Sequence, residues 1–496
     1  MRHKLIRIKY FLHRCIYLNM SDHFRPEIVN YTPVATHNGR YRIRRVLPSN
    51  ITGQTITLAP TATQLLELTW PARTPFNPAR TTIDYQLEID DPTANKYNWV
   101  HDHTVAEFES LSWGNVSGLS LVDLQYAANY LATARKLDTD QATFQTNDAT
   151  TALYKDNTES DNFYPPSVTP GTPNAYGVPG ARRVDCVGNH EPVYVRLGEP
   201  GVAPAGGVAG PPTVISRSIP LSAFTHTALA MDRDMMFGED LVLRIRISGH
   251  EKVAYVSDKD AHASTSNAAG QAAAITPVVG AKLTNICMRL AVQVDPAVEA
   301  HVRAKFDSGK MTFIFPYQYA WKVVGPAGHV AFQHNLTNQY GKKLKRFLVT
   351  AFNTAEQYTT AFDCNNMNAV KLDLYRTAMD SQPLQDEQIS CKQPSVLTGP
   401  GMDDFRENRH LLKGSVLDNS MTYYLNWLHV DSFSNPKREA SVLVPESNLL
   451  EGLDLTMPRI WSFSATAKSA LTYYCFGEFI RQVHASPAGP IELSVA

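Results

Sequence analysis

Alternation of apolar and polar residues over short segments is the feature that most constrains the fold of this chain. In Leu241–Ile247 (LVLRIRI), leucine and isoleucine occupy every second position, and two arginines lie between them. Thr63–Trp70 and Thr81–Ile89 alternate in the same way. Because successive side chains of a β-strand point to opposite faces, each segment is typical of a strand with one face in a core and the other in solvent. The chain is therefore predicted to consist largely of half-buried strands.

Further strands are expected along the chain, and helices are few. A short strand is predicted at Val193–Arg196. A second series is predicted at Leu283–Val294, Met311–Tyr319, Arg346–Phe352, Ala369–Tyr375, Met421–His429 and Leu471–Phe479. Apolar spacing predicts a helix over Leu121–Lys136, and a proline at the start favours helices over Leu221–Met231 and Pro296–Phe306.

The length of 496 residues allows two all-β domains, since one such domain can reach about 200–250 residues. Many strands, few short helices and long loops favour an all-β fold of two tandem jelly-roll β-sandwiches. We expect a basic N-terminal arm over residues 1–50 and a first jelly roll over 51–256. A polar connector over 257–280 and a second jelly roll over 281–496 follow. The Pro/Gly-rich stretch 165–212 is expected to form a long loop at a surface tower or tip.

Charge is sparse and unevenly distributed. Charged residues make up 19% of the chain, against about 25% in an average domain, and the formal net charge is −1. This composition excludes a long disordered protein, a coiled coil and a highly charged nucleic-acid binder, and it suits a protein that packs against copies of itself. Residues 1–60 nevertheless hold ten basic side chains and two acidic ones, Asp22 and Glu27. That segment is either a solvated arm or one that contacts a polyanion or an acidic neighbour.

The first residues and the cysteines bear on cellular location. Met1–Met20 is basic, but Lys9, His13 and Arg14 interrupt its apolar residues, so a secretory signal is not expected. A transit-like or membrane-surface helix and a true start at Met20 are the open alternatives. No later stretch reaches about 18 apolar residues, so no transmembrane segment is expected. The six cysteines are scattered without any CxxC, which indicates reduced thiols in an intracellular setting.

One group of residues resembles a metal site. His101, His103, Glu107 and Gly114 have the spacing of the first metal motif of cupins, and imidazoles suit iron, manganese or zinc. However, Asn95 stands where the motif requires glycine, and no second cupin motif follows; two loop histidines are the better interpretation. The chain also lacks a P-loop, GxSxG, HExxH and GxGxxG. No catalytic, cofactor-binding or metal residue is therefore predicted, and we expect neither a cofactor nor enzyme activity.

Six segments, in order, resemble one viral family. Met288–Val323 reads MRLAVQVDPAVEAHVRAKFDSGKMTFIFPYQYAWKV, and Leu411–Phe433 reads LLKGSVLDNSMTYYLNWLHVDSF. Both are similar to segments of the double jelly-roll major capsid proteins of polinton-like viruses, virophages and related small eukaryotic double-stranded DNA viruses. The other four similar segments are Phe76–Ile89, Ile219–Ile247, Glu451–Ala467 and Phe476–Leu493. The resemblance covers residues 55–493, and the departures are the insert 165–212 and the basic leader 1–19.

The resemblance implies a major capsid protein that forms pseudo-hexagonal trimers and tiles an icosahedral shell. The expected partners are the chain itself as a homotrimer, neighbouring capsomers, and penton and minor capsid proteins. The expected location is the virion, assembled inside the host cell in the nucleus or a cytoplasmic factory. Direct genome contact is doubtful because the charges at Arg40–Arg45 are few, and contact of Tyr41–Arg45 with a minor capsid protein is preferred. The alternatives are a jelly-roll carbohydrate-binding or cupin-like metal protein, and a nucleic-acid-binding coat based on the basic arm.

Overall fold

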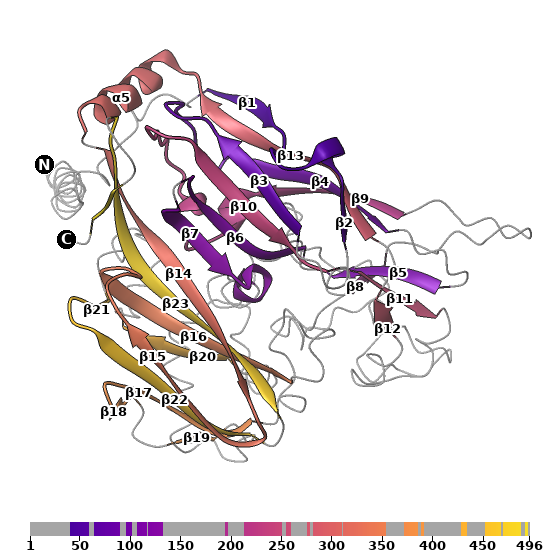
Figure 1. The fold of residues 1–496 in the computed structure, drawn as a ribbon, viewed down its shortest axis with the longest axis vertical. Helices are drawn as coiled ribbons and strands as arrows, with labels where there is room; N and C mark the ends of the chain where they lie inside the picture. The colour runs from indigo at the N-terminus through magenta and orange to yellow at the C-terminus, as the bar shows by residue number, and fades with distance from the viewer. Residues whose placement is uncertain are drawn as a thin grey trace, which may run out of the picture.

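The fold was analysed in a computed structural model of the chain. It describes residues 40–58, 64–89, 96–101, 107–116, 118–131, 194–196, 213–249, 254–258, 275–277, 281–309, 311–353, 372–384, 388–390, 428–433, 452–467, 470–487 and 492–494. These residues are mainly strands (Figure 1). Within these ranges, no helix is long and apolar enough to cross a membrane.

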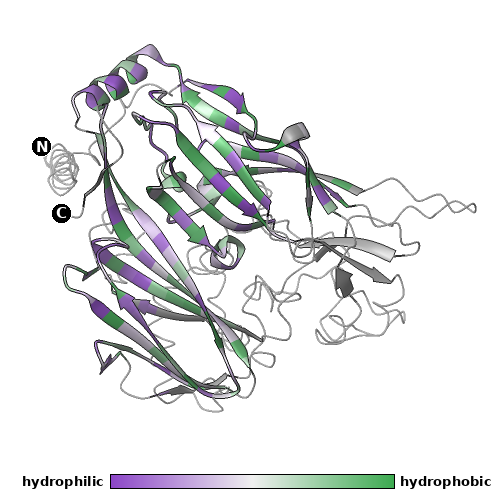
Figure 2. Cartoon of the chain, viewed as in Figure 1, coloured by the Kyte–Doolittle hydropathy of each residue, from purple (hydrophilic) through white to green (hydrophobic). Residues whose placement is uncertain are grey.

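The first β-sandwich consists of two antiparallel sheets. One sheet has the order β1 (Tyr41–Val46), β13 (Ala281–Gln293), β4 (Thr82–Ile89) and β9 (Thr213–Pro220), with β2 (Ile56–Leu58) also paired to β13. The facing sheet has the order β3 (Gln64–Trp70), β10 (Leu241–Ile247), β6 (Phe108–Asn115) and β7 (Ser120–Gln125). Apolar side chains of both sheets point inward, and alternating hydropathy is visible along the strands (Figure 2).

The second β-sandwich repeats this arrangement. One sheet has the order β14 (Met311–Gly325), β23 (Leu471–Ala485), β16 (Lys343–Asn353) and β20 (Leu428–Ser432), with β21 (Leu453–Asp454) on β16 and β24 (Glu492–Ser494) on β23. The facing sheet has the order β15 (Gly328–Leu336), β22 (Arg459–Ala467), β17 (Leu372–Met379) and β18 (Gln382–Pro383), with β19 (Ile389–Ser390) also on β17.

The two sandwiches share one strand order. With β1 and β2 counted together, the eight strands in chain order are β1/β2, β3, β4, β6, β7, β9, β10 and β13 in the first sandwich and β14, β15, β16, β17, β18, β20, β22 and β23 in the second. In each sandwich the first strand pairs with the eighth, the eighth with the third, and the third with the sixth. The second strand pairs with the seventh, the seventh with the fourth, and the fourth with the fifth. Two four-stranded sheets connected in this way form a jelly roll. The structure therefore confirms the predicted all-β class with two tandem jelly rolls and a few short helices.

A third, smaller sheet is inserted into the first jelly roll. It has the order β12 (Ile275–Pro277), β11 (Ala254–Asp258), β5 (Lys96–His101) and β8 (Tyr194–Arg196). Each of these strands lies in a connection between sandwich strands, and the sheet lies at one end of the first sandwich (Figure 1). Apart from Tyr194–Arg196, the Pro/Gly-rich stretch 165–212 lies outside the described residues, so its predicted tower remains a prediction.

The passage between the two jelly rolls is at α5 (Pro296–Asp307). Asp295 caps this helix, because its Oδ1 accepts a hydrogen bond from the Ala297 amide at 3.0 Å. β13 pairs with β1, β2 and β4, whereas the division at residue 281 had placed this strand in the second domain. We propose that the first domain ends after β13. On this division, β12 falls within the predicted connector 257–280, and β1 falls within the predicted arm 1–50.

Two of the three predicted helices are wrong in part. Leu121–Lys136 begins as strand β7, and only residues 127–131 are helical among those described. Over Leu221–Met231 the chain forms two short 3₁₀ turns, η4 (Leu221–Ala223) and η5 (Ala228–Ala230). The helix predicted at Pro296–Phe306 is confirmed by α5.

Each sandwich has an aromatic core. In the first, the ring of Trp70 lies 4.5 Å from that of Phe76 and 5.1 Å from that of Trp113, and all three side chains are buried. In the second, Trp461 lies 4.8 Å from Phe347. Large rings at the centre of each sandwich bury much apolar surface and hold the facing sheets together.

Matched leucines in the first sandwich test this account of the core. Leu111 is fully buried, so Leu111→Ala leaves a cavity and should lower the free energy of unfolding by about 2–5 kcal/mol. Leu65 is 40% exposed on the outer face, so Leu65→Ala should change it by about 0.5 kcal/mol or less. Urea unfolding followed by tryptophan fluorescence measures both. Equal losses for the two variants would contradict the assignment of faces.

We expect a half-buried histidine to make the second sandwich sensitive to acid. His334 stacks on Trp321 with the ring centroids 3.9 Å apart, and burial lowers the pKa of His334 below its usual range. The unfolded chain therefore takes up this proton first as the pH falls through about 6.5. The resulting stabilisation is fully present above that pH and is lost as the pH falls toward the lower pKa of the folded state.

We expect His334→Phe to reduce the loss of stability on acidification. The free energy of unfolding should be measured from about pH 7.5 to 5.5 for the wild type, for His334→Phe and for the control His329→Phe. His329 is exposed, so its replacement should leave the pH dependence unchanged. Parallel pH curves for all three proteins would show that His334 does not carry the effect.

Candidate functional site at the junction of the two sandwiches

The two sandwiches meet across a buried junction. The outer face of the β14–β23–β16 sheet packs against β7 and residues 127–131 of the first sandwich (Figure 1). The ring of Tyr474 lies 5.1 Å from that of Tyr126, and Phe476 lies 5.4 Å from Tyr130. β14 begins with five consecutive buried residues, Met311–Phe315, because both of its faces are covered there.

A charged cluster lies in the middle of this junction. Arg346 donates two hydrogen bonds to the carboxylate of Glu478, from Nε to Oε2 at 2.7 Å and from Nη2 to Oε1 at 3.0 Å. The hydroxyl of Tyr130 donates to Oε1 of the same carboxylate at 2.6 Å. The side chain of Glu478 is completely buried and that of Arg346 is 8% exposed. Arg346 and Glu478 lie opposite each other on the paired strands β16 and β23 of the second sandwich, so this two-point ion pair fixes the carboxylate to which Tyr130 of the first sandwich donates.

Gln318 extends the cluster back into the first sandwich. Its amide Nε2 donates to the hydroxyl of Tyr130 at 3.0 Å and also to the backbone carbonyl of His226. Tyr130 therefore accepts one hydrogen bond from the second sandwich and donates another to it. Because these groups are buried, a shift of one sandwich against the other would leave them unpaired in an apolar setting.

Arg481 forms a second connection across the junction. Its guanidinium lies 3.2 Å from the centroid of the Tyr317 ring and donates to the carbonyl of Ser120, in β7, at 3.0 Å. It also donates to the carbonyls of Tyr340 at 2.9 Å and Gln339 at 2.8 Å. Burial lowers the pKa of Arg481 and raises the pKa of Tyr317 to about 12, so Tyr317 is neutral at neutral pH.

The apolar core is continuous through the junction. Phe313 of β14 lies 5.7 Å from Phe237 of the first sandwich, ring to ring. Val483 and Ala485 of β23 belong to the same buried cluster as the first core. This continuity makes the two sandwiches one rigid block rather than two domains joined by a flexible linker.

The junction lacks the features of a reactive centre. The carboxylate oxygens of Glu478 are taken up by Arg346 and Tyr130, so this group is not placed to accept a proton from a substrate. Cys475, on the core face of β23, is buried, and burial raises its pKa well above the usual value, so its thiol is not activated. The arrangement positions two β-sandwiches and holds them.

Two residues of the cupin-like motif, Glu107 and Gly114, have other contacts in the structure. Glu107 is completely buried and pairs with Arg217 of β9 at 3.0 Å. Burial raises the pKa of Glu107, and Arg217 opposes that shift. His101 lies on β5 in the separate small sheet, opposite Tyr194, and His103 lies outside the described residues. In the part of the chain that the structure describes, no group of three His, Cys, Asp or Glu side chains could hold a metal ion.

Gly114, the last residue of that motif, has a packing role instead. It lies in β6, where a Cβ would collide with the backbone carbonyl of Leu119. The glycine is therefore required by the close approach of two chain segments.

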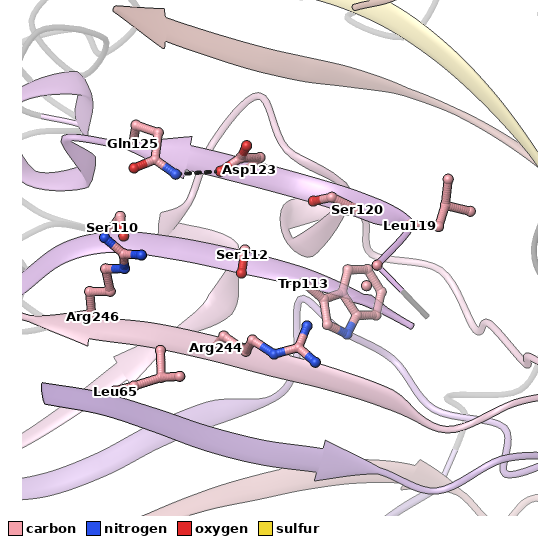
Figure 3. A pocket seen from close by; sticks show the side chains of 12 residues that line it. Leu65, Ser110, Ser112, Trp113, Leu119, Ser120, Asp123, Gln125, Arg244 and Arg246 are labelled. Atoms are coloured by element: carbon pink, nitrogen blue, oxygen red, sulfur yellow. Dashed lines mark hydrogen bonds between the residues drawn. The ribbon is translucent and has the colours of Figure 1, made fainter. Parts of the chain in front are cut away.

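A polar hollow of about 480 Å³ lies on the outer face of the β3–β10–β6–β7 sheet. Figure 3 shows Ser110 and Ser112 between the arginines of β10 and the polar side chains of β7. Arg244 pairs with Glu67 at 3.1 Å, and Gln125 donates to Asp123 at 2.6 Å. The alternation in Leu241–Ile247 correctly placed Arg244 and Arg246 on the outer face, but the hollow itself was not predicted.

Comparison with known proteins gives matches in structure only. No protein-family model matches the sequence, and curated proteins give no match either. The chain aligns with a chain of the Sputnik virophage structure at 9% identity and a TM-score of 0.49, covering 92% of this chain and 91% of that one. It aligns with PBCV-1 VP54 at 8% identity and a TM-score of 0.46, covering 94% and 100%. It aligns with the mavirus major capsid protein at 9% identity and a TM-score of 0.40, covering 95% of this chain and 94% of that one. None of these TM-scores reaches 0.5.

The central ion pair should be required for stability. Glu478→Gln keeps the shape of the side chain but removes the negative charge with which the buried Arg346 pairs, and should lower the free energy of unfolding by about 3–5 kcal/mol. The control is Asp380→Asn, because Asp380 pairs with Arg459 at 2.7 Å where both side chains are about one-third exposed. Its cost should be about 0–1 kcal/mol. Urea unfolding measures both.

A double variant separates charge from packing. Arg346→Met combined with Glu478→Leu removes both charges, so it should recover much of the stability that Glu478→Gln loses. If Glu478→Gln is no worse than Asp380→Asn, the junction does not depend on this ion pair.

Proposed function

We propose that this chain is a viral major capsid protein that self-assembles as pseudo-hexagonal trimers, which tile an icosahedral shell. The observation that carries the proposal is the repetition of one jelly-roll strand order within a single chain. A buried junction holds the two sandwiches side by side. A chain of this kind is a rigid building block with two similar sides.

Symmetry explains why such a block suits a shell. Three copies related by a threefold axis present six similar sandwiches, and a near-hexagonal outline fills a surface without gaps. The low charge content, 19%, and the net charge of −1 favour association of copies over mutual repulsion. The rigidity of the junction keeps the angle between the two sandwiches constant from copy to copy.

The proposal assigns neither an enzymatic step nor a cofactor to the chain. The cupin-like alternative needs Glu107 as a ligand, but this side chain is completely buried and paired with Arg217. The carbohydrate-binding alternative needs an exposed aromatic platform, whereas Trp70, Trp113 and Trp461 are all buried in the two cores. Stoichiometric metal in the purified protein, or binding in a glycan screen, would favour these alternatives.

The partners follow from the same proposal. The chain would contact itself within the trimer, neighbouring capsomers, penton proteins and minor capsid proteins. It would be located in the virion, after assembly in the nucleus or a cytoplasmic factory of the host cell.

Size-exclusion chromatography with mass measurement tests the proposal. We expect a stable species with three times the 55.1 kDa mass of the chain that persists on dilution, and hexagonal particles by negative-stain microscopy. A protein that remains a monomer at all concentrations would contradict the proposal.

A further inference from the structure

β1 is a strand with almost no buried surface. The side chains of Arg42 to Arg45 are all exposed, and only Tyr41 and Val46 at its two ends are half-buried. Ile43, in the middle, is 53% exposed. A strand of a sandwich normally covers the core with one face, so β1 gains little from apolar burial within this chain.

β1 is nevertheless held firmly in place. It pairs along its full length with β13, from Tyr41 opposite Gln293 to Val46 opposite Met288. The hydroxyl of Tyr41 donates to Asp234 at 2.9 Å, and this tyrosine accepts a hydrogen bond from Asn77 at 3.3 Å. These contacts hold β1 (Tyr41–Val46) in one position, so its exposed side chains form a fixed platform on the surface.

The platform carries positive charge that nothing described neutralises. No ion pair or hydrogen bond joins the side chains of Arg40, Arg42 or Arg44 to another described residue. The acidic side chains near the start of β1 are already engaged: Asp234 accepts from Tyr41 and from Gln293, and Asp232 pairs with Arg80.

The far edge of β1 is open in the part of the chain that the structure describes. β1 is the last strand of its sheet on that side, so its outward backbone N–H and C=O groups face no other described strand. Such an edge is a template on which an extended peptide can add as a further strand. Ile43 in β1 and Leu47 just after it have exposed apolar side chains.

We propose that β1 binds an extended acidic segment of another protein, which adds to the sheet as a strand. Carboxylates of the segment would pair with Arg42 and Arg44, and its apolar residues would contact Ile43. The open backbone edge and the exposed apolar residues favour a peptide over nucleic acid, which would use only the charge. The inference depends on the proposed function only for the source of the segment, another component of the shell.

Fluorescence anisotropy on the full chain tests this contact. The probe is a labelled, acetylated peptide of alternating glutamate and valine, and its control is the same peptide with alternate backbone nitrogens methylated. We expect the first to bind and the second, which cannot complete the strand pairing, to bind about tenfold more weakly or worse. The double variant Arg42→Glu, Arg44→Glu should weaken binding of the first peptide by about tenfold or more.

Matched controls keep the result interpretable. Arg246 and Lys342 are also exposed, so Arg246→Glu with Lys342→Glu makes the same change in net charge away from β1 and should leave binding unchanged. Unfolding midpoints and mass measurement on each variant show whether the fold and the oligomer persist, which separates failure here from failure of the proposed shell function.

Three outcomes would overturn the inference. If neither peptide binds, the arginines serve only to keep the strand edge from aggregating. If both peptides bind equally, the contact is electrostatic and involves no added strand. If a single-stranded oligothymidylate binds more tightly than the peptide, with a steep salt dependence, the surface recognises nucleic acid.

Discussion

The hydrogen bond from the Tyr130 hydroxyl to Glu478, whose carboxylate is held by Arg346 on the neighbouring strand, is the constraint on which the relative orientation of the two sandwiches depends. Each sandwich has its own aromatic core, but only the junction determines how one is oriented against the other. Burial makes this cluster sensitive to misalignment, because an unpaired carboxylate or guanidinium at this place could not form hydrogen bonds with water. The apolar contacts around the cluster bury surface area in many possible orientations of the two sandwiches. The hydrogen bonds select one of these orientations.

This division of roles explains why the long strands β14 and β23 differ from the others. Their side chains must serve two partners: one face completes the second core, and the other forms the junction. Alternation is therefore lost, and β14 opens with five buried residues in a row. By contrast β4, which corresponds to β16 in the shared strand order, alternates strictly and carries Asp84, Gln86 and Glu88 on its outer face. The polarity of the outer faces therefore shows which sheet is covered within one chain.

Strands with one buried face were predictable from the sequence, and strands with two buried faces were not. β3, β4 and β10 were predicted within a residue or so of their observed bounds because their alternation is clear. Leu121–Lys136 was predicted as a helix because Leu121 and Leu124 are three residues apart, as on one face of a helix, but the pairing of β7 with β6 makes its start a strand. β13 was expected to belong to the second domain because no local pattern reveals a strand's partner. The junction was not predicted either, since Glu478 lies 132 residues from Arg346 and 348 from Tyr130.

The contact inside the chain is also a guide to contacts between copies. It joins unlike faces, an outer sheet of the second sandwich and the β7 side of the first, so it is heterologous, and repeated contacts of that kind close into rings or run on as filaments. The sheet equivalent to the covered one, on the first sandwich, has a polar outer face, where Lys282 pairs with Glu88 at 2.8 Å and Ser218 donates to Asp84 at 2.8 Å. A face that meets another copy only after synthesis must first be soluble, so it cannot be as apolar as one that is buried while the chain folds. Under the proposed function, this difference in polarity between two equivalent sheets suits a subunit that meets its neighbours after folding.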